Sequence, residues 1–193
     1  MNNLRQRLLC GTVLGGAAAL LLAGTTPAIA SPCPAAGADT TCGLIITLNP
    51  NGTGSITATG QGPYDGIEDT MIGVVNSSGH SVGAISLTAT TSIFAFDGDG
   101  IDTYTGASNA IDTTGYGGPL TYFTNINGAL TAGTANFIGG LGSGASTYFS
   151  LEEPLTSASF KVAVPEPASM LLLGTALAGF ALVRRRRKTA GPT

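Results

Sequence analysis

The sequence predicts a mainly β protein, with an antiparallel β-sandwich lying between two terminal segments of different character. Short segments rich in Ile, Val, Thr and Phe alternate with turns that contain Gly, Asn and Pro. The composition, with 29 Gly, no Trp and 10% charged residues, is typical of a β-rich extracellular module. No segment between the two ends shows a helical hydrophobic period.

The N-terminal segment, residues 1–30, has the layout of a secretory signal peptide. Arg5 and Arg7 give it a positive start, an uncharged apolar run follows, and small residues lie at the expected cleavage position. We expect this segment to be an apolar signal helix that is removed after Ala30. The mature chain would then begin at Ser31.

Residues 31–163 are expected to form one domain that is large enough for a hydrophobic core. Alternation of apolar and polar residues, bounded by turn signals, identifies its candidate strands. In chain order these are Leu44–Leu48, Ser55–Thr59, Thr70–Val75, Val82–Thr88, Leu120–Thr124, Thr134–Ile138, Thr147–Leu151 and Ala158–Ala163. A further short apolar segment is Ile93–Phe96.

Two of the three cysteines remain after export, because Cys10 lies in the signal peptide. An even pair in an oxidising compartment predicts a disulfide between Cys33 and Cys42 that closes a small N-terminal loop. The alternative is two free thiols.

The charge of the predicted domain is strongly negative. It holds ten acidic residues and a single basic one, Lys161, for a net charge of −9, against −3 for the whole chain. A domain with a single basic residue has no basic surface for phosphate backbones, which excludes nucleic acid as a partner. Such a domain attracts cations and repels anionic polysaccharide unless a cation bridges the two.

The run from Asp97 to Asp102 is the best candidate for a ligand site. Alternate aspartates with intervening glycines can surround a calcium ion, which takes several oxygen ligands from a flexible loop. The sequence nominates Asp97, Asp99 and Asp102 as the calcium ligands, with Asp112, or Glu68 and Asp69, completing the shell. The alternative is a solvated turn in which the aspartates cap backbone amides.

Catalytic residues are not apparent, and we expect neither enzyme activity nor an organic cofactor. His80 is the single histidine, which leaves no His-centred triad or His-rich zinc site. The acidic pairs Glu68–Asp69 and Glu152–Glu153 consist of neighbours, and neighbours on a strand point to opposite faces. A polysaccharide-active enzyme built from distant carboxylates is the least supported alternative.

Two segments of the predicted domain resemble immunoglobulin-like bacterial surface domains. Val74–Gly79 followed by Ile85–Leu87 is similar to paired strands of such domains, and Gly139–Gly144 before Thr147–Leu151 is similar to a later turn and strand. The resemblance implies an immunoglobulin-like β-sandwich, and it implies nothing definite about function.

The C-terminal segment, residues 164–188, has three parts. Pro165-Glu166-Pro167 precedes an uncharged apolar run over about 168–183, and Arg184 to Lys188 close it. As a helix the apolar run spans about 24 Å, short of a hydrocarbon core of about 30 Å, so snorkelling arginines or local thinning must make up the difference. We expect a transmembrane helix whose basic end is cytoplasmic.

This arrangement resembles the PEP-CTERM sorting signal of exported Gram-negative proteins, followed here by a short tail, 189–193. The matching motif residues are Pro165, Glu166, Pro167, Arg184, Arg185, Arg186 and Arg187. The resemblance implies transient anchoring in the inner membrane, processing by an exosortase-like membrane protease, and release to the cell surface or an exopolysaccharide matrix. The role expected of the domain is non-catalytic, with calcium or polysaccharide binding as the alternative.

Overall fold

A computed structural model of the chain describes residues 31–165 and 175. The predicted signal peptide, most of the predicted transmembrane helix at about 168–183, the motif residues after Pro165 and the tail therefore lie outside the described residues. Within the described part of the chain, no helix has both the length and the apolar character needed to cross a membrane.

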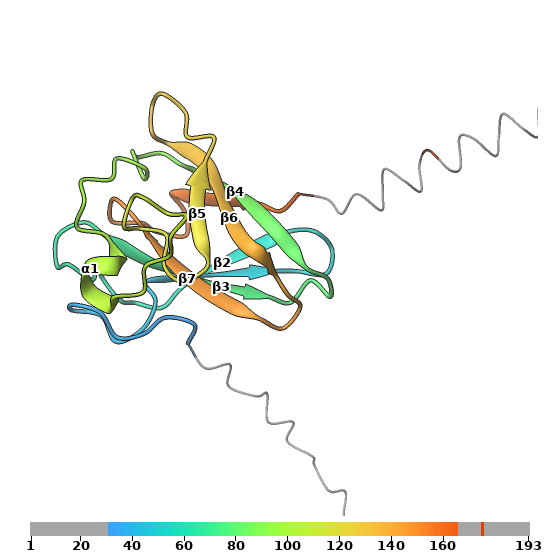
Figure 1. The fold of residues 1–193 in the computed structure, drawn as a ribbon, viewed down its shortest axis with the longest axis horizontal. Coiled ribbons are helices and arrows are strands. Elements are labelled where there is room, and N and C mark those ends of the chain that lie inside the picture. The colour runs from blue at the N-terminus through green and yellow to red at the C-terminus, as the bar shows by residue number, and fades with distance from the viewer. Residues whose placement is uncertain (1–30, 166–174, 176–193) are drawn as a thin grey trace, which may run out of the picture.

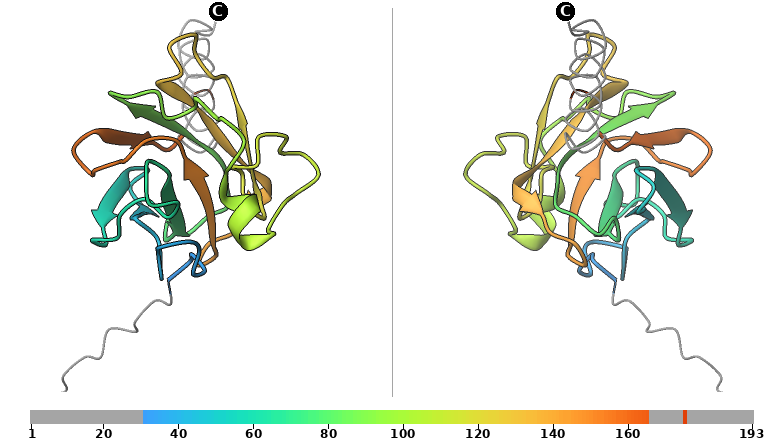
Figure 2. Two further views of the ribbon diagram at one scale, coloured as in Figure 1. Left: turned by 90° about the vertical axis from the view of Figure 1, so that its left-hand side faces the viewer. Right: turned by 90° about the vertical axis from the view of Figure 1, so that its right-hand side faces the viewer.

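The described residues form two four-stranded sheets in a sandwich-like arrangement (Figure 1). The first sheet has the strand order β2-β1-β3-β7 and the second the order β5-β6-β4-β8. The strands are β1 Leu44–Leu48, β2 Gly54–Ala58, β3 Thr70–Asn76, β4 Val82–Ala89, β5 Thr121–Thr124, β6 Ala132–Leu141, β7 Ser146–Leu151 and β8 Phe160–Ala163. One short helix, α1 Ile101–Thr105, lies in the long connection between β4 and β5, which stands out on the side away from β8 (Figure 2).

The strands lie where alternation predicts them, with shifts of a residue or two at most ends. The largest difference is β6, which begins at Ala132 and ends at Leu141, beyond both ends of the predicted segment. The apolar segment Ile93–Phe96 forms a turn rather than a strand, and Ile93 and Phe94 enter the core. The helix α1 was not predicted, because five residues are too few to show a helical period.

The predicted antiparallel sandwich has one exception, since β1 and β3 are parallel. β2 pairs antiparallel with β1 and ends at Ala58, beside Leu44 at the start of β1. The loop 59–69 then carries the chain to the other side of β1, where β3 begins and Ile72 pairs with Leu44. Because β3 starts from the same end of the sheet as β1, the two strands run in the same direction.

The main core lies between the sheets and takes alternate residues from each strand. In β1, Leu44, Ile46 and Leu48 are buried while the intervening residues are partly exposed. β3 differs, because all seven of its residues are buried. Its outer face is covered by a second cluster that contains the N-terminal loop, made of Cys33, Ala36, Cys42, Tyr64, Met71 and Ile101.

A disulfide joins Cys33 to Cys42 and lies directly over Gly73 of β3. A Cβ atom on Gly73 would lie 2.4 Å from Cys42 Sγ and 2.4 Å from Pro32 Cγ. Contacts this short do not occur, so the absence of a side chain at Gly73 lets the disulfide loop pack on the sheet.

Replacing Gly73 with Ala tests this close approach. The added methyl group requires the disulfide or Pro32 to move, so we expect the free energy of unfolding to fall by about 1–3 kcal/mol. Gly83→Ala is the matched control, since Gly83 also lies in a strand and a Cβ atom there meets nothing within 4 Å. The control should change stability by less than about 0.5 kcal/mol in chemical unfolding. Equal losses in both variants would contradict this packing.

Reducing the disulfide should also weaken the fold. The two cysteines are 9 residues apart, and closing so short a loop stabilises a protein by about 2–3 kcal/mol in the chain-entropy description. We expect reductant to lower the unfolding midpoint of the wild-type protein and to leave that of a Cys33→Ala/Cys42→Ala variant unchanged. A wild-type midpoint that is insensitive to reductant would show that the bridge does not constrain the domain.

Candidate functional site

Three loops that carry acidic residues meet at the end of β7. The buried Ser150 is their common partner: its Oγ accepts a hydrogen bond from Ile101 N at 3.2 Å and lies 3.3 Å from the Tyr64 hydroxyl. Its backbone N donates to the carbonyl of Tyr116 at 2.8 Å. Because α1 begins at Ile101, the hydrogen bond from Ile101 N holds the start of the helix next to the end of β7.

The first loop, 64–69, presents Glu68. Asp65 organises this loop, because its Oδ1 accepts hydrogen bonds from the backbone N–H groups of Ile67, Glu68 and Asp69 at 3.1, 3.1 and 3.0 Å. This is the Asx-turn geometry that a short acidic side chain supplies. The loop therefore holds Glu68 in a defined position ahead of β3.

The same loop contains a fully buried carboxyl group at Asp69. Its Oδ2 accepts a hydrogen bond from the Tyr64 hydroxyl at 2.7 Å, and its Oδ1 has no partner. The pKa of Asp69 is raised to about 7: burial is the largest cause, the neighbouring carboxylates of Glu152 and Asp99 contribute, and the hydrogen bond from Tyr64 opposes them. Burial also raises the pKa of Tyr64, so its hydroxyl remains a donor.

The second loop carries Asp97 and Asp99, and a group of aromatic rings holds it in place. Phe96 stacks on Tyr116 with ring centroids 4.4 Å apart. It also lies 5.2 Å from Phe123 of β5, whose ring meets that of Phe149 of β7 edge-on at 5.6 Å. Because these rings come from both sheets, the loop is fixed against the core.

The Tyr116 hydroxyl lies between two carboxylates of this loop. It is 3.0 Å from Asp97 Oδ1 and 2.9 Å from Asp99 Oδ1, and it has one hydrogen to donate. A side-chain hydrogen bond between the two acids lowers the pKa of Asp97 and raises that of Asp99. Burial raises the pKa of Tyr116, and the nearby Glu152 and Asp99 add to the effect.

A further acidic residue, Glu152, directly follows the last residue of β7. Among the described residues, Glu68, Asp97 and Glu152 form a group in which one carboxylate oxygen of each residue lies within 4.8 Å of those of the other two. Glu152 is only 5% exposed, and its Oε2 has no hydrogen-bond partner. Burial raises its pKa, and the carboxylates of Asp97, Glu68 and Asp99 act in the same direction although Tyr116 opposes them. Three carboxylates thus converge at one point, and that of Glu152 is buried away from solvent.

The residues that the sequence nominates as ligands are divided between two places. Asp97 and Asp99 meet at Tyr116, whereas Asp102 lies in the first turn of α1. Burial and the charge of Asp112 raise the pKa of Asp102. Asp112 itself is occupied with capping, since its Oδ2 accepts hydrogen bonds from the backbone N–H groups of Gly115 and Gly117, both at 3.0 Å.

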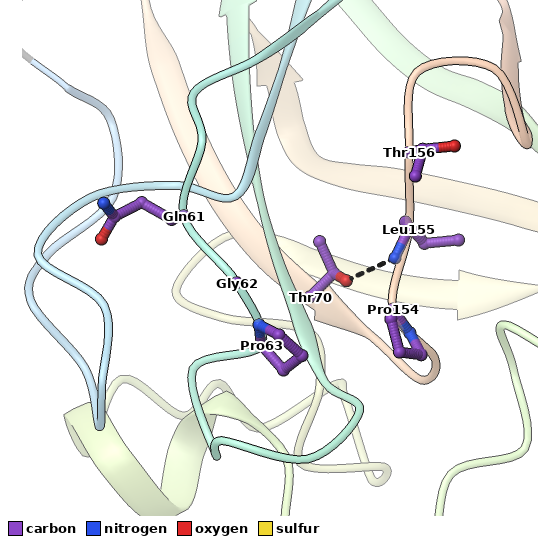
Figure 3. Close-up of a pocket in the computed structure, with 7 residues that line it drawn as sticks. All are labelled: Gln61, Gly62, Pro63, Thr70, Pro154, Leu155 and Thr156. Atoms are coloured by element: carbon purple, nitrogen blue, oxygen red, sulfur yellow. Dashed lines mark hydrogen bonds between the residues drawn. The ribbon is translucent and has the colours of Figure 1, made fainter.

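Two other features of the described residues include none of these acidic side chains. His80 is in the β3–β4 turn, where its Nδ1 lies 3.2 Å from the carbonyl oxygen of Ser78. A pocket of about 120 Å³ lies beside the start of β3, where Thr70 Oγ1 accepts a hydrogen bond from Leu155 N at 2.9 Å (Figure 3). No residue of its lining is ionisable: it consists of Gln61, Gly62, Pro63, Thr70, Pro154, Leu155 and Thr156.

The role of Asp65 in presenting Glu68 can be tested by substitution. Asp65→Ala removes the acceptor of three backbone N–H groups, so we expect a loss of stability of about 1–2 kcal/mol. Hydrogen exchange at residues 67–69 should accelerate by tenfold or more. Asp65→Asn is the control, because its side-chain carbonyl oxygen can still accept these bonds. Unchanged exchange at residues 67–69 in Asp65→Ala would show that the loop does not depend on this side chain.

Comparison with known proteins concerns the C-terminal segment. A family model described as the PEP-CTERM protein-sorting motif matches residues 163–187. No curated protein and no solved structure matches the chain significantly. The matched residues begin at Ala163, the last residue of β8, so the sorting motif follows the folded domain without a spacer. The chain is a PEP-CTERM domain-containing protein, exported and sorted through exosortase.

Proposed function

We propose that this protein is a non-catalytic cell-surface or extracellular-matrix module, which the sorting motif first tethers to the inner membrane and then releases. The observation that carries the proposal is the family match over residues 163–187. In the proposed order of events, the signal peptide is removed after Ala30 and the apolar run at about 168–183 anchors the chain with its arginines in the cytoplasm. Processing near Pro165–Pro167 then frees the domain.

The fold supports release of an intact module. β8 ends at Ala163 and pairs with β4, so the segment 44–163 begins and ends with a strand that belongs to a sheet. The isolated bridge between Thr53 and Ala163 also links the last residue of β8 to the residue that precedes β2. A cut after Ala163 leaves these pairings in place. We propose that the domain is immunoglobulin-like, a classification that rests on the resemblance of its strands.

A non-catalytic role is supported by how the polar groups are used. The pocket beside Thr70 has no acid or base in its lining. The converging carboxylates meet at a buried residue, Glu152, whereas a glycosidase needs its two carboxyl groups on either side of a substrate groove. The lone His80 belongs to a turn.

We propose that the released domain contacts exopolysaccharide because it resides in the extracellular matrix. Tyr116, near the loop that the sequence suggests for binding, is fully buried and cannot stack on a sugar. Tyr104, at 40% exposure, is the more accessible ring in the α1 connection. A net charge of −9 on the domain favours a neutral polysaccharide, or an anionic one with a bridging cation.

Intact mass of the mature protein tests this proposal. In cells with an active exosortase we expect loss of residues 1–30 and of the segment that follows Pro165–Pro167, and the protein should leave the inner membrane. A Pro165→Ala/Glu166→Ala/Pro167→Ala variant should retain the C-terminal segment, whereas a chain that lacks only residues 189–193 should be processed normally. A wild-type protein that keeps Thr193 and stays in the inner membrane would overturn the proposal.

A further inference from the structure

We propose that Glu68, Asp97 and Glu152 bind one calcium ion at the end of β7. This inference is independent of the sorting function. It retains Asp97 from the aspartate run that the sequence singles out. It leaves out Asp99 and Asp102, keeps Glu68 from the residues suggested to complete the shell, and adds Glu152, which the fold brings in from a distant part of the chain.

The spacing of the carboxylates fits a single ion. Calcium binds oxygen at 2.3–2.6 Å, so two ligands of one ion lie at most about 4.6–5.2 Å apart. One oxygen from each of the three carboxylates lies within 4.8 Å of the other two. All three can therefore reach a common centre without a change in the fold.

The buried carboxylate gives an independent reason to expect a cation. Glu152 is 5% exposed and its Oε2 has no hydrogen-bond partner. An uncompensated buried charge is costly, so buried carboxylates are paired or coordinate metals. Lys161, the one basic residue between Ser31 and Pro165, is exposed on β8, and no ion pair is formed among the described residues. The described residues therefore supply no positive charge to compensate Glu152.

The ligand chemistry favours calcium over other common ions. The converging atoms are carboxylate oxygens, which suit hard cations, whereas zinc prefers nitrogen and sulfur. The cysteines of the domain are joined in a disulfide and His80 is held in the β3–β4 turn. Neither Glu68 nor Asp97 is buried, so the ion can enter from solvent and keep water ligands. Magnesium requires a stricter octahedral geometry and gives up its water reluctantly.

Calcium-dependent stability of the full-length protein is the first test. The protein is purified in detergent, freed of metal with EGTA, and unfolded by heat with and without CaCl₂. Extracellular calcium modules have Kd values of about 0.1–1 mM, and at saturating calcium we expect the Tm to rise by about 5–10 °C. Terbium, which replaces calcium, should give luminescence sensitised by Tyr116, because its hydroxyl is 3.0 Å from Asp97 Oδ1.

Isosteric variants locate the site. Glu152→Gln removes the buried charge, so it should unfold at the same or a higher temperature than wild type in EGTA and bind calcium at least tenfold more weakly. Glu68→Gln should also lose the calcium shift, and it covers the case in which Glu152→Gln does not fold. Glu153→Gln is the matched control at the neighbouring acid and should keep the shift. Asp102→Asn should keep it too.

Two results would overturn the inference. One is a wild-type protein that shows neither a calcium-dependent Tm nor sensitised terbium emission at millimolar ion. The other is a calcium shift that survives in both Glu152→Gln and Glu68→Gln, which would place the ion elsewhere on this acidic domain. Loss of the shift in these two variants together with its retention in Glu153→Gln and Asp102→Asn would establish the site.

Discussion

The end of β7 is the point on which both the fold and the candidate site depend. Phe149 and Leu151 fill the core between the sheets, while Ser150 between them joins the loops of Tyr64, Ile101 and Tyr116 by hydrogen bonds. Glu152 follows, and its backbone N donates to the carbonyl of Ile93 at 3.2 Å, which ties in the loop that leads to Asp97. The strand thus aligns three loops from separate parts of the chain, and the carboxylates converge because the loops do.

This convergence is notable in a domain that contains almost no positive charge. Asp39, Asp69 and Glu152 are all buried, and burial raises the pKa of each. For Asp69 the Tyr64 hydroxyl and a proton supply the compensation, since its pKa of about 7 allows it to be neutral near physiological pH. Glu152 has oxygens of two further carboxylates within 4.8 Å, and a single shared cation would compensate all three charges, whereas a proton would neutralise only one. A divalent ion from the extracellular medium is available only after export, so the proposed location and the proposed ligand are consistent with each other.

Local sequence patterns predict the strands well and their arrangement less well. Alternation places β1 at its observed bounds, and counting cysteines pairs Cys33 with Cys42. The parallel pairing of β1 and β3 is not visible locally, because it depends on which side of β1 the chain returns to. In the site, Asp97 and Asp99 stand out as a Gly-spaced run. Glu152 does not, because the alternation of strand neighbours between opposite faces ends with β7 at Leu151, and Glu153 has a φ of 81°. A carboxylate immediately after a strand of apolar and aromatic residues is the signal that would have identified Glu152.

Anomalous diffraction data from crystals of the protein grown in calcium would locate the ion. We expect an anomalous peak at the end of β7 with oxygens of Glu68, Asp97 and Glu152 at about 2.3–2.6 Å. This calcium site would be contradicted by a structure that has no peak there and in which Glu152 is a neutral acid hydrogen-bonded to its neighbours. A peak between Asp102 and Asp112 alone would also contradict it.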